Sequence, residues 1–171
     1  MRIVRERTKM KQNAAPERTA MEYKYIIPET HINTPDDPSP VCLHETSTSS
    51  PIIYDRNDLV IPMQDGFTVR PNCPPNQTDR YLQTGAAEIH LRNVKSILDR
   101  GGGETPFVGQ QFTFLVHKYK PDTGVFTLDT FNFHYGQVVF EILCDAVEYR
   151  FCEFTSDSWR EQVRNMMKGL Q

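Results

Sequence analysis

The sequence predicts an α+β fold, in which an antiparallel meander of four or more strands is closed by a C-terminal amphipathic helix. Apolar residues alternate with polar residues over four short stretches between residues 112 and 151. They recur with helical spacing from residue 159 onward, and again over residues 85–100. A chain of 171 residues allows one such core with additional segments around it.

Composition changes near residue 80. Of the 12 prolines, all but Pro106 and Pro121 come before this point. Residues 33–50 combine proline with serine, threonine and aspartate, and cannot bury enough apolar surface to offset their ordering entropy. We therefore predict that residues 1–80 are largely disordered or extended, with short docking strands at 23–27 and 52–61. Residues 81–171 are predicted to form a single α+β domain.

A helix is predicted over residues 85–100. Thr84 is available as its N-cap, and the three glycines 101–103 would end it. Its apolar stripe has the spacing i, i+4, i+7 and i+11 and consists of Ala87, Leu91, Val94 and Leu98. A strand over residues 88–94 is the alternative. The helix is favoured because the apolar positions continue to Leu98.

Two antiparallel strand pairs are predicted next. Residues 112–116 and 125–128 alternate around the turn residues 121–124, Pro-Asp-Thr-Gly, which is a hairpin signal. Residues 138–144 and 147–151 repeat the pattern around a turn near Asp145.

A capping cluster at residues 155–158 precedes the last predicted helix, and Glu161 follows Ser158 at capping-box spacing. The apolar face of this helix consists of Trp159, Val163, Met166 and Leu170. We expect it to pack Trp159 across one face of the sheet.

The basic, aromatic strand at residues 117–120, its turn and the alternating strand that follows resemble the C-terminal half of pleckstrin-homology-like domains, including phosphotyrosine-binding domains of the insulin-receptor-substrate type. The resemblance covers residues 111–171 and implies an interaction scaffold. Where those phosphotyrosine binders have arginines after the hairpin, this chain has residues 132–135, Asn-Phe-His-Tyr. If the predicted helix at 85–100 is included, the chain contains a helix, then four strands, then a second helix. This order of elements is similar to that of RWD-type interaction domains.

Charge and hydropathy restrict the classes of function. The net charge of −3 provides no global attraction to nucleic acid or to an anionic membrane. No apolar run reaches the roughly 18 to 20 residues of a membrane span, and no apolar signal core follows the basic N-terminus. The sequence thus predicts an intracellular protein, cytoplasmic or nuclear, without a membrane span.

Site chemistry gives few signals. The four cysteines and five histidines lack metal-ligand spacing, and the glycines 101–103 lack the Lys and Ser/Thr of a phosphate-binding loop. No G-x-S-x-G nucleophile pattern is present. We predict no metal, no cofactor and no catalytic residue. An enzyme whose site is assembled from distant residues stays an alternative.

Aromatic residues form the strongest functional signal. Residues 131–136 lie between the two predicted hairpins, where alternation breaks. We predict that they bind a protein partner through Phe131, Phe133, His134 and Tyr135. The alternative is that these rings pack in the core. The leading hypothesis is a non-catalytic protein-interaction module or a subunit of a larger assembly, of undetermined oligomeric state.

A second hypothesis is a nucleic-acid-associated protein that uses exposed aromatics for stacking and a basic tail for phosphate contacts. The tail residues that would do this are Arg2, Arg5, Arg7, Lys9 and Lys11. A solvated tail is the simpler interpretation, because its positive charges are few and interspersed with glutamate.

Overall fold

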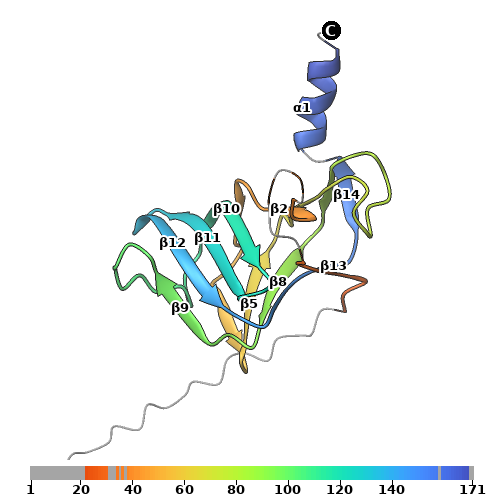
Figure 1. The fold of residues 1–171 in the computed structure, drawn as a ribbon. Helices are drawn as coiled ribbons and strands as arrows, with labels where there is room; N and C mark the ends of the chain where they lie inside the picture. The colour runs from red at the N-terminus through yellow and green to blue at the C-terminus, as the bar shows by residue number, and fades with distance from the viewer. Residues whose placement is uncertain (1–21, 31–33, 35, 37, 158, 170–171) are drawn as a thin grey trace, which may run out of the picture.

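The fold consists almost entirely of antiparallel strands (Figure 1). The computed structural model describes residues 22–30, 34, 36, 38–157 and 159–169. Within these residues it contains three sheets and one helix.

Sheet 1 has the strand order β1 (Tyr25–Pro28), β13 (Ala146–Phe151), β8 (Ala87–Arg92), β5 (Asp58–Met63) and β4 (Ile53–Asp55). Sheet 2 has the order β3 (Thr46–Ser47), β10 (Thr113–Lys120), β11 (Val125–Asn132), β12 (Gly136–Leu143) and β9 (Ser96–Asp99). Sheet 3 is smaller, with the order β14 (Phe154–Asp157), β7 (Leu82–Thr84), β6 (Thr68–Val69) and β2 (Val41–Cys42).

Sheets 1 and 2 face each other across the hydrophobic core. The His117 ring of β10 and the Tyr149 ring of β13 have centroids 6.4 Å apart, which places the two sheets in contact. Phe126 and Phe140 of sheet 2 are fully buried in the same cluster as Ile89 of sheet 1. Strict alternation of inward and outward residues in β13 matches its apolar pattern. In β11 the same holds for Phe126 and Leu128, whereas at the end of the strand Thr130 is buried and Phe131 is exposed.

The predicted hairpin at residues 112–128 is confirmed as β10 and β11. Gly124 closes its turn with a φ of 69°, and a Cβ there would lie 2.6 Å from the Cys144 carbonyl oxygen. Only glycine meets both conditions at low cost, because it has no Cβ and populates positive φ readily.

The predicted helix at residues 85–100 is wrong, because this segment forms β8 and β9. Residues 87–91 are all buried, since β8 is an inner strand of sheet 1 that is covered on both faces. Within β8 the apolar Ala87, Ile89 and Leu91 alternate with polar residues, as in a strand. The helical stripe appears only when Val94 and Leu98, which lie beyond a turn, are counted together with Ala87 and Leu91. Asn93, with a φ of 47°, turns the chain between the two strands.

The predicted α+β meander is also wrong, because the fold is β-rich and β12 and β13 do not pair. β12 pairs with β11 and β9 in sheet 2, while β13 pairs with β1 and β8 in sheet 1. The chain crosses from one sheet to the other at Cys144 and Asp145. The Asp145 N–H donates to the Arg92 carbonyl at 2.9 Å, which joins the corners of the two sheets.

Strands from before residue 80 share this core. The stretch predicted as a docking strand at 52–61 forms β4 and most of β5, and Leu59 and Ile61 are fully buried. Pro62 lacks an N–H but removes no backbone hydrogen bond between β5 and β8. Its carbonyl faces away from β8 and accepts from the Ser49 N–H at 2.9 Å. A residue's N–H and C=O point to the same side of a strand, so the missing N–H also faces away from β8.

The predicted C-terminal helix is confirmed as α1 (Trp159–Lys168), but it projects from the body of the molecule (Figure 1). Polar contacts attach it: the buried Glu161 carboxylate accepts from the Tyr81 N–H at 3.0 Å, and the Arg164 guanidinium donates to the Asp79 carbonyl at 2.6 Å. Met166 and Met167 are exposed. The Trp159 side chain lies outside the described residues.

Candidate interaction surface

The turn between β11 and β12, here called the aromatic tip (residues 131–136), brings together the four predicted partner-binding residues. Phe133 is 99% exposed, and Phe131 and Tyr135 are 37% and 39% exposed. The Phe131 and Phe133 rings meet edge to face with centroids 5.5 Å apart, and His134 and Tyr135 do the same at 4.6 Å. The tip therefore presents two pairs of contacting rings to solvent.

Asn132 holds the backbone of the aromatic tip. Its side-chain oxygen accepts from the N–H groups of His134 at 2.7 Å and Tyr135 at 3.2 Å. Its side-chain amide donates to the Gln111 carbonyl at 2.7 Å. Asparagine turns of this kind satisfy the loop's own polar groups. An ordered tip loses little conformational entropy when it binds.

The apolar surface continues from the tip onto the outer face of sheet 2. Val116 pairs with Asp129 in the ladder and is 48% exposed, and Leu98 pairs with Glu141 and is 57% exposed. Charged groups lie between these apolar residues. Gln137 donates to the Asp129 carboxylate at 3.0 Å. Such a mixture of apolar and polar groups is typical of the surfaces through which proteins bind each other reversibly.

A hollow of about 510 Å³, here called the edge hollow, lies beside the aromatic tip. Its walls are the loop after β9, with Asp99, Arg100, Gly101, Gly103 and Thr105, and the first half of β12 with Tyr135 before it. The Asp99 carboxylate accepts from the Gly101 N–H at 2.8 Å. Hydrogen bonds from Thr105 and Gly101 hold the pKa of Asp99 below its usual range. Tyr135 belongs to both the tip and the hollow.

A second, polar hollow of about 290 Å³ lies between the edge of sheet 2 and sheet 3. His44 Nδ1 donates to the Leu115 carbonyl at 2.8 Å, and its Nε2 lies 3.7 Å from a Glu45 carboxylate oxygen. The Ser47 hydroxyl is hydrogen-bonded to the Thr113 hydroxyl at 2.8 Å. Among the described residues, no hydrogen bond joins the His44 imidazole to the Ser47 hydroxyl, as a nucleophile and base pair would require.

A buried polar cluster lies between sheets 1 and 2. The Tyr149 hydroxyl donates to a Glu29 carboxylate oxygen at 2.9 Å, and the Ser39 hydroxyl donates to the same oxygen. His117 Nε2 lies 4.0 Å from that oxygen. Burial, and to a smaller extent the charge of Arg70, lowers the pKa of His117 to about 4. Burial raises the pKa of Tyr149. Sequence inspection missed this cluster, because its members are far apart in the chain.

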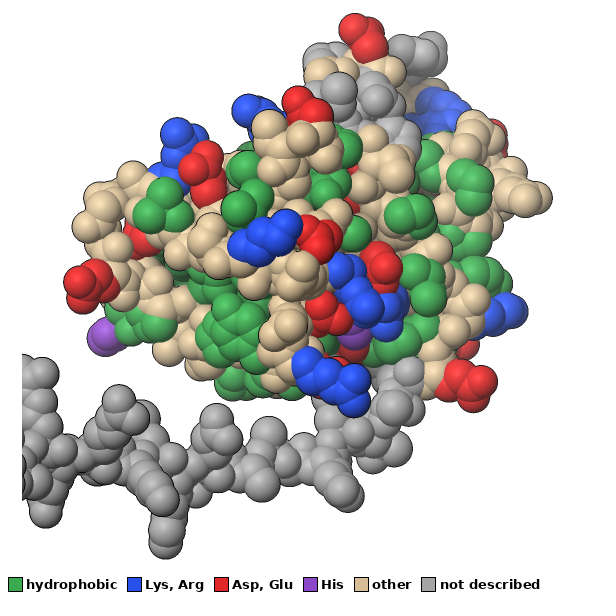
Figure 2. All heavy atoms as spheres, turned by 60° about the horizontal axis from the view of Figure 1, so that its bottom comes forward, with side chains coloured by type: hydrophobic (Ala, Val, Ile, Leu, Met, Phe, Trp, Pro, Cys, Tyr) green, Lys and Arg blue, Asp and Glu red, His purple; other side chains and the backbone are tan. Residues whose placement is uncertain are grey.

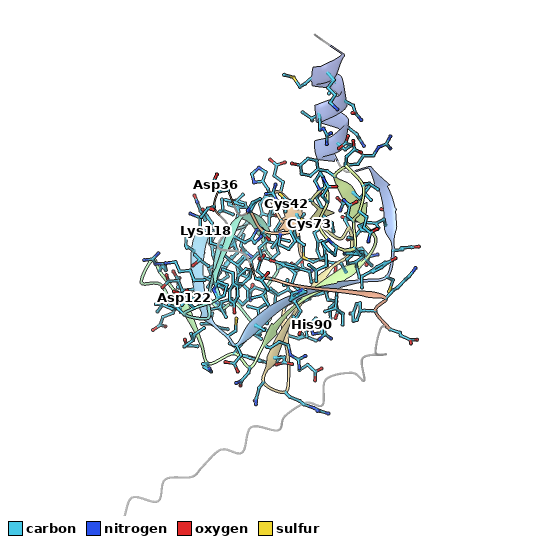
Figure 3. All side chains as sticks on the ribbon, turned by 45° about the vertical axis from the view of Figure 1, so that its right-hand side comes forward. Asp36, Cys42, Cys73, His90, Lys118 and Asp122 are labelled. Carbon is cyan, nitrogen blue, oxygen red and sulfur yellow. The ribbon has the colours of Figure 1, made fainter. Side chains whose placement is uncertain are left out.

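The histidines and cysteines of the described residues are spread over the molecule. In Figure 3, His90 lies at the lower side of the molecule, whereas Cys42 and Cys73 lie toward its upper side. Among the described residues, no three His, Cys, Asp or Glu side chains are grouped so as to hold a metal ion. No helix in this part of the chain is long and apolar enough to cross a membrane.

The basic tail residues Arg2, Arg5, Arg7, Lys9 and Lys11 lie outside the described residues. On the face shown in Figure 2, cationic and anionic side chains are interspersed. That face therefore has no field of a single sign that would attract a polyanion.

Comparison with known proteins finds no matching family model, no similar curated protein and no similar solved structure. The resemblance of residues 111–171 to pleckstrin-homology-like domains stays a prediction.

Proposed function

We propose that this chain is a non-catalytic protein-interaction module that docks through its aromatic tip. The observation that carries this proposal is the Phe133 ring, which is 99% exposed on a turn whose backbone is held by Asn132. An exposed phenylalanine contributes nothing to the core of the free chain. Burying such a ring in a partner stabilises the complex by about 1.5 to 3 kcal/mol.

The partner that fits is a protein with an apolar pocket for Phe133 and polar groups around the pocket. The Phe131 ring contacts the Phe133 ring edge to face. Tyr135 adds a ring that is apolar on its faces and carries a hydroxyl group for hydrogen bonding. Aromatic side chains surrounded by less important contacts are the usual centres of binding energy at protein interfaces. A turn that is already ordered would leave more of this energy available for binding.

The test compares the chain with its Phe133→Ser variant. Proteins captured from the native extract by the unmodified chain are identified, and the affinity of each purified partner is then measured against both chains. We expect a loss in affinity of at least about tenfold, since interface aromatics cost about 2 kcal/mol or more on truncation. The unfolding free energy should change by less than about 0.5 kcal/mol.

Met167→Ser is the matched control, because Met167 is also an exposed apolar residue (62%) but lies on α1. It should leave the affinity unchanged. Equal affinity of the unmodified and Phe133→Ser chains for every captured partner would contradict the proposal. So would an equal loss in Met167→Ser.

A further inference from the structure

Strand β12 is paired unequally along its two sides. On one side β11 pairs with its entire length, from Gly136 to Leu143. On the other side β9 pairs only with residues 140–143, and the chain leaves the sheet after Arg100. The edge hollow begins at the point where this pairing ends.

The direction of the backbone groups in β12 follows from two hydrogen bonds. The Lys95 N–H donates to the Leu143 carbonyl at 2.8 Å, and the Arg100 N–H donates to the Val139 carbonyl at 2.9 Å. Both carbonyls thus face away from β11. Because orientation alternates along a strand, the N–H and C=O of Gln137 face the same way, toward the hollow.

The loop after β9 is turned away from this edge by its own contacts. Asp99 binds the Gly101 N–H, and Gly102 has a φ of 72°. A Cβ on Gly103 would meet only the movable end of the Asp99 side chain, so the positive φ of Gly102 is the feature of this loop that favours glycine. The hollow of about 510 Å³ is the space left between this loop and β12.

An extended polypeptide is the ligand whose hydrogen-bonding groups match such an edge. A strand beside β12 would lie about 4.8 Å away and pair with the N–H and C=O of Gln137. Its side chains would alternate between the two sides of the sheet, and Tyr135 would flank it. The hollow lies within the range of about 300 to 1,000 Å³ that is typical of ligand sites.

The charges around the edge hollow indicate which peptide is favoured. Asp99 and Arg100 line it, Asp129 is bound to Gln137 at its wall, and Glu141 pairs with Arg100 at 3.4 Å. The exposed Glu104 lies in the loop. Glu141 compensates the charge of Arg100, whereas Asp99 in the lining and Asp129 beside Gln137 form no ion pair with a cationic side chain among the described residues, so a lysine or arginine in the ligand is favoured.

We propose that the open edge of β12 binds an extended, basic segment of a partner protein by strand addition. This inference rests on the proposed function: the aromatic tip holds the partner through side chains, and the adjacent edge holds it through backbone hydrogen bonds.

Gln137→Pro tests the edge in the full chain. It removes the N–H that faces the hollow but no bond to β11, and proline is tolerated at such edge positions. Gln137→Ala is the matched control, because it removes the side-chain bond to Asp129 and keeps the N–H. The probe is a short capped peptide of alternating lysine and valine, titrated into isotopically labelled protein and followed by amide chemical shifts.

We expect saturable shifts at Gln137, Val139 and Tyr135, with affinity at least about tenfold lower for Gln137→Pro and unchanged for Gln137→Ala. An alternating glutamate and valine peptide should bind more weakly. The same lysine and valine peptide with alternate amides N-methylated should lose binding to the unmodified chain, which keeps the test decisive if Gln137→Pro fails to fold.

Strand addition at β12 is overturned if the lysine and valine peptide does not bind, binds without shifts at Gln137, or binds equally after N-methylation. Phe133→Ser separates the two proposals. It should lower the affinity for the captured partner without removing the chemical-shift changes that the peptide causes at Gln137. Loss of partner binding in Phe133→Ser, together with no peptide binding at β12, would retain the aromatic tip and remove only strand addition.

Discussion

The centre of β12 and the turn before it use the same residue types for opposite purposes. At the centre of the strand, Phe140 is fully buried and contacts Phe107 and Phe112, with ring centroids 4.7 and 5.3 Å apart. In the turn before β12, the aromatic tip leaves Phe133 99% exposed. An aromatic residue is therefore part of the core only where a second layer faces it, and four predictions test this contrast.

The largest expected effect is at the centre of β12. Phe140→Ala should lower the unfolding free energy by roughly 3 to 5 kcal/mol, because it leaves a cavity among three packed rings. Phe133→Ala should change it by less than about 0.5 kcal/mol. Denaturant unfolding of both variants measures the difference. Similar losses in the two variants would show that the tip is part of the core.

The next effect is a pH dependence caused by His117. Its pKa is about 4 in the folded chain against 6.5 in the unfolded chain, so the unfolded state binds more protons between these values. The contribution of the neutral imidazole to the unfolding free energy has its full value above pH 6.5. This contribution falls by about 3 kcal/mol in total as the pH decreases toward 4. His117→Gln should flatten the curve of unfolding free energy against pH in that window. An unchanged slope would contradict the assignment.

A smaller effect is expected from the hydroxyl of Tyr149. Tyr149→Phe removes one of the donors to the buried Glu29 carboxylate and should destabilise the chain by about 1 to 3 kcal/mol. Tyr135→Phe at the aromatic tip is the control and should leave stability unchanged. Thermal unfolding at neutral pH compares the stabilities of the two variants. Equal stability of Tyr149→Phe and the parent chain would show that Glu29 does not need this donor.

The smallest effect concerns the order of the aromatic tip. Asn132→Ala removes the acceptor for two backbone N–H groups and should cost about 1 kcal/mol of stability or less. It should raise the amide exchange rates of His134 and Tyr135, while those of Phe140 stay slow. Unchanged exchange at the tip would mean that Asn132 does not hold the turn.

The sequence by itself determined the features that depend on short stretches of chain. The hairpin of β10 and β11 follows from alternation on both sides of the turn at residues 121–124, and α1 follows from its apolar spacing. The position of Phe131, Phe133, His134 and Tyr135 at a turn was also readable, because alternation breaks between two strands there. In each case neighbouring residues alone decide the local conformation.

Only the tertiary structure decided which strands share a sheet and which faces are covered. The predicted helical stripe of residues 87–98 spans two strands, β8 and β9, that belong to different sheets. β12 and β13 separate because their pairing partners come from distant parts of the chain. Glu29, His117 and Tyr149 meet only once the sheets have packed, and the open edge at Gln137 exists because β9 ends early. These features depend on long-range contacts, which no local periodicity encodes.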